Sequence, residues 1–185
     1  MWGWIIVIAV IILWLIVYIM RTYNKLIVLR NRVKDQWAQI DVQLKRRFDL
    51  IPNLVETVKG YASHEKETLE AVIEARNKFQ AANTPAEEME ANGELSRVLS
   101  RLMVLSEAYP ELKANQNFLN LQRDLNETEE KIAYARQFYN DSVLTYNNKC
   151  EVFPSNVIAG MFHFELQKFF EVTEGEREAP KVSFE

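Results

Sequence analysis

The sequence of 185 residues predicts an all-α protein, in which an N-terminal transmembrane helix continues into an antiparallel bundle of four long, coiled-coil-like helices. Three observations lead to this prediction. The first 20 residues carry no charge, apolar residues then recur every three or four positions, and only 5 Gly and 5 Pro are present. An all-β protein would need more turn residues and a two-residue period. We expect a transmembrane helix over 1–20, a bundle over 21–150 and a Phe-rich C-terminal segment, a short helix with a tail, over 151–185.

The N-terminal segment has the length and composition of a membrane span. Trp2 to Met20 contains Ile, Val, Leu and Trp almost without interruption. As a helix it would extend about 28 Å, close to the thickness of the hydrocarbon core. A cleaved signal peptide would need basic residues before the apolar run and small residues at a cleavage site, and neither is present. We therefore expect a retained, single-pass anchor.

The charges next to this segment predict its orientation. Residues 1–34 carry five basic side chains and no acidic one, whereas the rest carries 17 basic against 26 acidic side chains. The positive-inside rule places the N-terminus outside and the C-terminal domain in the cytoplasm. The basic collar favours anionic lipid as a partner. The acidic domain argues against nucleic acid, which requires a cationic face.

An amphipathic helix is expected to follow the anchor without a break, because no punctuating residue separates them. Pro52 lacks the N–H group that would bond to the carbonyl of Phe48, so we expect a bend there. Beyond Gly60 two interpretations stay open: Ser63 caps a new helix, or one rod continues to about residue 82. The apolar stripe consists of Leu26, Leu29, Val33, Trp37, Ile40, Leu44, Phe48, Ile51, Val55 and Val58.

Two further helices have clear signals. Thr84, Pro85 and Glu87 form a capping-box pattern that opens a helix running to about residue 105. Tyr109 and Pro110 mark a turn. The last long helix carries the strongest periodicity, a 3.5-residue repeat that predicts a left-handed, near-antiparallel seam. Its members are Phe118, Leu121, Leu125, Thr128, Ile132, Ala135, Tyr139, Ser142 and Tyr146.

Two regions of this pattern allow more than one interpretation. The pairs Tyr139-Asn140 and Tyr146-Asn147 lie seven residues apart, and they are either core tyrosines with neighbouring hydrogen-bonding groups or a polar recognition ladder. The Phe-rich segment, with Phe162 and Phe169 at helical spacing, either folds back over the open end of the bundle or binds a membrane surface or a partner. Val182 and Phe184 are further candidate docking points.

No motif predicts catalysis, a metal or a cofactor. The chain has one cysteine, two histidines and no phosphate-binding loop or nucleophile–base motif, so we expect no enzyme activity. His163 is expected to be a packing or interfacial residue. The best candidate for a structured polar site is the group Arg46, Arg47 and Asp49, with Glu129 or Glu130 as its partner on another helix.

The chain resembles the LemA family of bacterial membrane proteins, over essentially its whole length. The sharpest stretch is Trp37–Glu65, which includes Arg47, Asp49-Leu50-Ile51-Pro52-Asn53-Leu54-Val55 and Lys59-Gly60-Tyr61-Ala62. A second block is Tyr109-Pro110-Glu111-Leu112-Lys113-Ala114, and a third contains Thr128-Glu129, Ala135-Arg136, Tyr139-Asn140 and Tyr146-Asn147. Pro180-Lys181-Val182 and Phe184 are similar to the family's usual ending.

This resemblance implies a location in the bacterial inner membrane and a cytoplasmic bundle, with no established catalytic residues or cofactor. It also implies an association with membrane-bound zinc metalloproteases, and one relative takes part in magnetosome membrane formation. Two functional hypotheses follow. The first is a non-enzymatic, membrane-anchored scaffold that forms homo-oligomers, because a tether concentrates the copies in two dimensions. The alternative is an adaptor that regulates a membrane metalloprotease or other inner-membrane machinery through residues 151–185.

Overall fold

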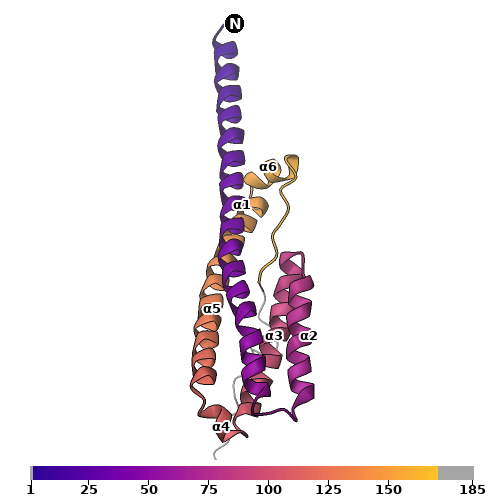
Figure 1. The fold of residues 1–185 in the computed structure, drawn as a ribbon. Helices are drawn as coiled ribbons and strands as arrows, with labels where there is room; N and C mark the ends of the chain where they lie inside the picture. The colour runs from indigo at the N-terminus through magenta and orange to yellow at the C-terminus, as the bar shows by residue number, and fades with distance from the viewer. Residues whose placement is uncertain (1, 171–185) are drawn as a thin grey trace, which may run out of the picture. The chain divides into compact units, whose positions relative to one another are not determined.

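The computed structural model describes residues 2–170, and in this range the chain is all-α, as predicted. Six helices are present there: α1 (Trp2–Lys59), α2 (Lys66–Ala81), α3 (Pro85–Ser106), α4 (Pro110–Lys113), α5 (Gln116–Glu151) and α6 (Ser155–Met161) (Figure 1). The expected docking points Val182 and Phe184 lie outside the described residues, as does the tail motif that begins at Pro180.

Helix α1 combines the apolar N-terminal segment and the first bundle helix in one element of 58 residues, which confirms the expected continuity. Its side chains from Trp2 to Val17 are exposed to the surroundings, and the segment is long and apolar enough to cross a membrane. Pro52 lies inside the helix and does not end it. The bend expected at Pro52 stays a prediction.

The structure decides between the two interpretations at Gly60, and it differs from both in detail. Helix α1 ends at Lys59, and a turn leads to α2, so the single rod to residue 82 is wrong. The residue before α2 is Glu65, which makes no capping bond through its side chain, so the cap expected at Ser63 is also wrong. Gly60 has no positive φ. Its role is therefore not to allow a left-handed conformation.

The start of α3 confirms the capping box. The hydroxyl of Thr84 accepts a hydrogen bond from the backbone N–H of Glu87, and the Glu87 carboxylate accepts one from the backbone N–H of Thr84. Pro85 occupies the first turn, where its missing N–H costs nothing. At the other end of α3 the turn lies at Glu107 and Ala108, directly before the expected Tyr109 and Pro110, and Pro110 begins the short α4.

Contacts divide the chain into two compact units, and both α1 and α5 contribute to each. Among the described residues, unit 1 comprises residues 2–38 and 137–169, and unit 2 comprises residues 39–136 together with Phe170. The four long helices of unit 2 enclose an apolar cluster that includes Leu54, Val72, Leu102 and Phe118, each at most 1% exposed. The proposed division at residues 20 and 150 stays a prediction, as does the coiled-coil geometry of the seam.

The predicted stripe on α5 faces inward along the whole helix. Phe118, Leu125, Thr128 and Ile132 are buried in unit 2, and Tyr139, Ser142 and Tyr146 are buried in unit 1. Ala135 and Leu121 are half-buried.

The helical spacing of apolar residues over 157–170 predicts a helix through this range, and this prediction is wrong beyond Met161. Helix α6 ends at Met161, and His163 has a φ of 55°, in the left-handed region that ends a helix. Residues 164–170 then run without helical structure. His163 itself is exposed, so it is not a packing residue, and its alternative role as an interfacial residue stays a prediction.

Candidate functional site

A buried arginine joins three helices of unit 2. Arg47 of α1 is 4% exposed, and its Nη1 donates hydrogen bonds of 2.9 Å to Oδ1 of Asn92 and Oγ of Ser96, both on α3. The same nitrogen lies 2.9 Å from Oε2 of Glu129 on α5. We call these four residues the arginine junction. The ion pair of Arg47 with Glu129 is one of the pairings that the sequence left open.

The arginine junction suits a structural role better than a chemical one. A buried guanidinium costs free energy unless a counter-charge and acceptors surround it, and here α3 and α5 supply both. The Glu129 side chain is 43% exposed, so the pair is reached by water from one side. The Ser96 hydroxyl and the Glu129 carboxylate both contact the Arg47 guanidinium, so they serve to compensate its charge. Its geometry can set the relative register of α1, α3 and α5.

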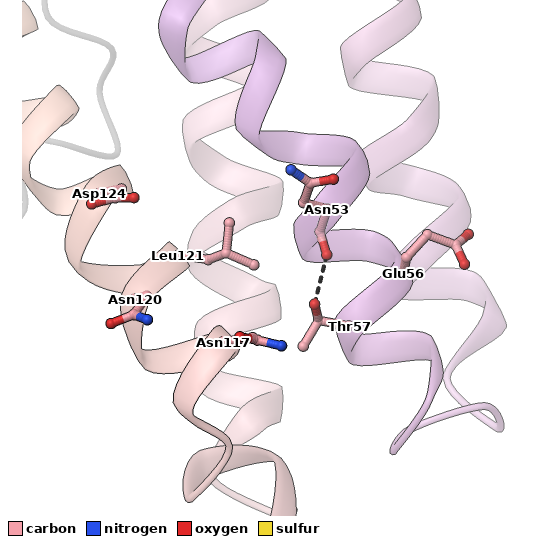
Figure 2. A pocket seen from close by; sticks show the side chains of 7 residues that line it. All are labelled: Asn53, Glu56, Thr57, Asn117, Asn120, Leu121 and Asp124. Atoms are coloured by element: carbon pink, nitrogen blue, oxygen red, sulfur yellow. Dashed lines mark hydrogen bonds between the residues drawn. The ribbon is translucent and has the colours of Figure 1, made fainter.

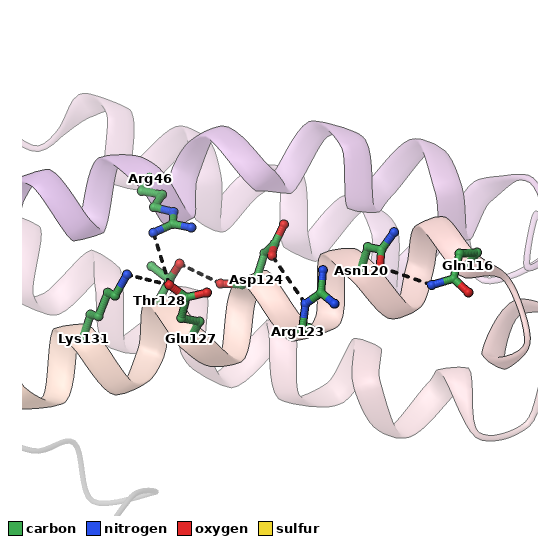
Figure 3. Close-up of polar contacts among 8 residues, drawn as sticks. All are labelled: Arg46, Gln116, Asn120, Arg123, Asp124, Glu127, Thr128 and Lys131. Carbon is green, nitrogen blue, oxygen red and sulfur yellow. Dashed lines mark hydrogen bonds and ion pairs between the residues drawn. The ribbon is translucent and has the colours of Figure 1, made fainter.

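The neighbouring charges lie on the surface of the same unit. Arg46 pairs with Glu127 at 3.7 Å, not with Glu129 or Glu130, and both side chains are more than 40% exposed. Glu127 also accepts a bond from Lys131, and this bond together with the two cations lowers the pKa of the Glu127 carboxyl (Figure 3). Asp49 is exposed and lies outside the arginine junction. Exposed pairs of this kind stabilise a fold by only about 0–1 kcal/mol.

Pro52 and Asn53 lie near a shallow polar hollow between α1 and α5. The hollow has a volume of about 440 Å³, and Figure 2 shows Asn53 and Thr57 facing Asn117 across it. The hydroxyl of Thr57 donates to the carbonyl oxygen of Asn53 at 2.7 Å. The remaining lining residues are Glu56, Asn120, Leu121 and Asp124. Among the described residues no group of three His, Cys, Asp or Glu side chains could hold a metal ion, so the hollow offers hydrogen-bonding groups and no metal site.

Tyr109 and Pro110 tie the turn after α1 to the turn after α3. The Tyr109 hydroxyl donates to Oε1 of Glu65 at 2.9 Å, and this hydrogen bond raises the pKa of the phenol. Asn115 donates to the hydroxyl of Tyr61 at 2.9 Å, and it also caps α5 by accepting from the N–H of Phe118. These bonds close one end of the bundle in unit 2.

In unit 1 the tyrosine and asparagine pairs bind the chain's own C-terminal segment. The hydroxyl of Tyr146 donates to the carbonyl of Glu165 at 2.9 Å, and that of Tyr139 donates to the carbonyl of Lys168 at 3.0 Å. Asn147 makes two bonds of 2.9 Å with the backbone of Gln167, one as donor and one as acceptor. We call the segment Phe164–Phe169 the strap and Tyr139, Tyr146 and Asn147 the clasp.

Burial explains the electrostatics of the clasp. Desolvation raises the pKa of both tyrosines, so both phenols stay protonated and act as donors. Trp37 packs against Tyr139 with 5.5 Å between ring centroids, which orients the phenol. Asn140 is half-buried beside it. The tyrosines are therefore core residues with hydrogen-bonding groups, and what they recognise in the described chain is the strap backbone.

The two phenylalanines selected from the sequence differ in their surroundings. Phe162 is 47% exposed and meets Tyr23 of α1 edge-on at 4.8 Å. Phe169 is 42% exposed. Nearby, Cys150 is buried, and burial raises the pKa of its thiol, so it lacks the thiolate character of a reactive cysteine.

Sequence reasoning missed Asn92 and Ser96. The sequence did contain a signal for Asn92, because it lies three residues before Leu95 and seven before Leu99, on the apolar face of α3. A polar residue at such a position needs a buried partner. Nothing in the sequence signals that the strap backbone is the partner of the clasp.

Comparison with known proteins decides the family. A family model described as the LemA family matches residues 36–184. The chain belongs to the LemA family. Protein LemA of Metamycoplasma hominis is 24% identical over 155 residues, which cover 83% of this chain and 71% of the relative.

Magnetosome proteins are also similar to this chain. Magnetosome protein MamQ 2 of Paramagnetospirillum magneticum is 23% identical over 175 residues, and MamQ of Magnetospirillum gryphiswaldense is 22% identical over 174. In both cases the match covers 80% of this chain but 64% of the relative, so the chain spans less than two-thirds of their length. Together with the exposed apolar segment of α1, these similarities make this LemA-family chain a membrane protein, and none of the relatives' names denotes an enzyme.

Proposed function

We propose that this LemA-family protein is a non-enzymatic scaffold that is anchored in the bacterial membrane and self-assembles at the cytoplasmic face. The single observation that carries the proposal is α1, which begins as an exposed apolar span and supplies core residues of unit 2 without an intervening loop. A domain attached in this way is confined to the membrane plane. Confinement raises the effective concentration of copies, so weak contacts suffice for assembly.

Exposed apolar side chains on unit 2 offer such contacts. Val104 of α3 is 74% exposed, Tyr134 of α5 is 66% exposed and Val42 of α1 is 60% exposed. Single exposed apolar residues are common on soluble proteins. On a tethered bundle, however, each of them faces neighbouring copies at high local concentration. We infer that contacts of this kind hold the assembly together.

The cytoplasmic orientation is supported by the charges after the apolar span. Arg21 and Lys25 are exposed on α1, and no acidic residue precedes Asp35. Basic residues within about 15 positions of a span are retained on the cytoplasmic side. The same side chains attract anionic headgroups.

The alternative, an adaptor for a membrane metalloprotease that uses the Phe-rich segment, receives less support. Phe162 and Phe164 already contact Tyr23, and the strap backbone is bound by the clasp. A partner that captured this segment would have to displace these contacts. An adaptor role through another surface remains a separate hypothesis about the same protein.

Mass measurement of the full-length chain extracted in native lipid particles tests the scaffold. We expect particles with several copies, and a smaller mean copy number for the double variant Val104→Ser and Tyr134→Ser. The matched control is Gln39→Ser with Asn126→Ser, two exposed polar positions of the same unit, and it should leave the copy number unchanged. Particles that hold one copy at every concentration would refute self-assembly.

A further inference from the structure

One side of α6 is apolar and exposed although the other side is packed. Ser155, Ile158 and Ala159 are 2–5% exposed and face the interior of unit 1. Val157 and Met161, one helical turn apart, are 52% and 62% exposed, and Phe153 in the preceding turn is 77% exposed. We call Phe153, Val157 and Met161 the outer face of α6. Three large apolar side chains that are exposed within one short segment of a folded unit indicate a binding surface.

The segment that carries the outer face contains no charge. From Val152 to Phe164 there is no Asp, Glu, Lys or Arg, whereas Glu151 and Glu165 flank it directly. Most water-facing helix surfaces of this chain carry charged side chains, as α2 and the exposed side of α5 do. An uncharged, apolar outer face is suited to a medium less polar than water.

Ring contacts place the end of α6 beside the membrane boundary of α1. The Phe162 ring, directly after α6, lies 4.8 Å from the ring of Tyr23, and Phe164 lies 5.7 Å from it. Tyr23 is three residues beyond Met20, the end of the apolar run, which is about 4.5 Å along a helix axis. Figure 1 shows α6 next to α1 in this region.

The burial of α1 changes at the same level. Side chains from Trp2 to Val17 are exposed, Tyr18 and Ile19 are half-buried, and Thr22 and Leu26 are 5% and 0% exposed. The protein thus begins to cover α1 where the lipid would stop. The contacts of Phe162 and Phe164 with Tyr23 therefore place the end of α6 at the level where the apolar run of α1 ends.

We propose that α6 is an interfacial membrane helix, whose outer face inserts into the headgroup region of the bilayer that α1 spans. The occupant of this surface is lipid, and the argument is its continuity with the lipid-exposed part of α1. Insertion by about 5–10 Å is typical of such helices. Tyr23 suits this depth because its ring is apolar and its hydroxyl is polar, and phenylalanine such as Phe153 is common on the apolar face of such helices. A second contact with the bilayer restricts the rotation of α1 about its own axis, so unit 1 faces the membrane with one defined side.

Depth-dependent fluorescence quenching of the full-length chain in lipid nanodiscs tests the proposal. An environment-sensitive fluorophore is attached at Val157→Cys, and the control label is placed at Phe138→Cys. Phe138 is 60% exposed and lies on α5 of the same unit, 13 residues before Glu151, or about 20 Å along the helix. The wild-type chain measures background labelling at Cys150, which is buried.

We expect nitroxide lipids with the spin label close to the headgroup to quench the Val157 label several-fold more than the Phe138 label. Aqueous iodide should quench the two labels in the reverse order. Quenching of the Val157 label by iodide alone would overturn the proposal, since the face would then lie in water. Protection from both quenchers would also overturn it, because a protein surface, such as a second copy, would then cover the face.

A second label guards against a local distortion at Val157. Met161→Cys, one turn further on the outer face, should give the same order of quenching as Val157→Cys. Circular dichroism of each labelled chain checks that the helical content is retained. Opposite results at the two positions of one short helix would contradict insertion of the face as a whole.

Discussion

Units 1 and 2 share the helices α1 and α5, but different interactions stabilise the interior of each unit. Unit 2 encloses an apolar cluster from four helices, and in the arginine junction three neighbouring residues surround the buried charge of Arg47. In unit 1, polar side chains of α5 bind the backbone of the extended strap. A helix packs against its neighbours through apolar side chains because its own backbone groups are already bonded. A non-helical strap has free backbone groups, so it must be held by side chains that hydrogen-bond.

The buried residues of the α5 stripe differ in type between the two units. In unit 2 its buried members are mainly apolar, such as Phe118, Leu125 and Ile132, whereas in unit 1 they are Tyr139, Ser142 and Tyr146. The periodicity is the same in both. The hydroxyl groups of Tyr139 and Tyr146 lie in the half of α5 that binds the strap backbone.

Among the variants that test the difference between the two units, we expect Arg47→Met to lower the free energy of unfolding most. The substitution leaves the buried Asn92 without its donor and Glu129 without its counter-charge, so we expect a loss of about 3 kcal/mol in the free energy of unfolding. Denaturant unfolding of the full-length chain in detergent measures it. Hydrogen exchange should accelerate in α3 and stay slow in the strap.

The neighbouring substitution Arg46→Met is the control. Its ion pair is exposed, so a change of less than about 1 kcal/mol is expected. Equal losses for the two variants would show that the arginine junction contributes no more than a surface pair.

A smaller effect, confined to unit 1, is expected from Asn147→Ala. This change removes both hydrogen bonds to Gln167, for a loss of about 1–2 kcal/mol. The amide of Gln167 should exchange faster in hydrogen-exchange mass spectrometry, while the amides of α3 stay protected. Asn148→Ala, at an exposed neighbouring position, is the control and should leave the Gln167 amide protected. Faster hydrogen exchange throughout both units would contradict the conclusion that different interactions stabilise unit 1 and unit 2.

The smallest effect concerns two adjacent carboxyls of α3 in unit 2. Burial, with repulsion from Asp41, raises the pKa of Glu88, so its contribution to stability is present below its unfolded pKa and is lost as the pH rises through the folded value. Hydrogen bonds from the N–H groups of Asn83 and Thr84 lower the pKa of Glu87, so its contribution is present above the unfolded pKa and is lost on acidification.

At pH 7, Glu88→Gln should therefore raise the thermal midpoint, by about 1 °C, and Glu87→Gln should lower it. Both differences should shrink as the pH falls below the ordinary range of a glutamate. Thermal melts followed by circular dichroism at pH 7 and pH 4 measure them. A change of the same sign for both variants would contradict the assigned causes.

Sequence alone predicted the elements whose signals are local. The uncharged span, the capping box at Thr84 and the stripe of α5 each depend on residues within a few turns of one another, and the structure contains all of them. The ion pair of Arg47 with Glu129 was also among the anticipated pairings. The LemA resemblance, which rests on ordered blocks along the chain, was confirmed over residues 36–184.

Other features depended on packing between distant segments. Between Leu44 and Ile51, both Arg47 and Phe48 fit the helical spacing, and the sequence favoured Phe48 for the interior. In the structure Arg47 is buried, because Asn92, Ser96 and Glu129 compensate its charge. Phe48 is half-buried, and the guanidinium of Arg76 lies over its ring. No local pattern contains that information.

The C-terminal segment shows the same limit. The spacing of Val157, Met161, Leu166 and Phe169 is helical, yet the helix ends at Met161. Backbone groups of residues 165–168 are bound by Tyr139, Tyr146 and Asn147, which lie about 20 to 30 positions earlier in the chain. Local propensity amounts to tenths of a kcal/mol per residue, and several hydrogen bonds together outweigh it. The sequence by itself thus determined the helices that have local signals, and only the tertiary structure decided where α6 ends and which side chains, charged or polar, the helices enclose.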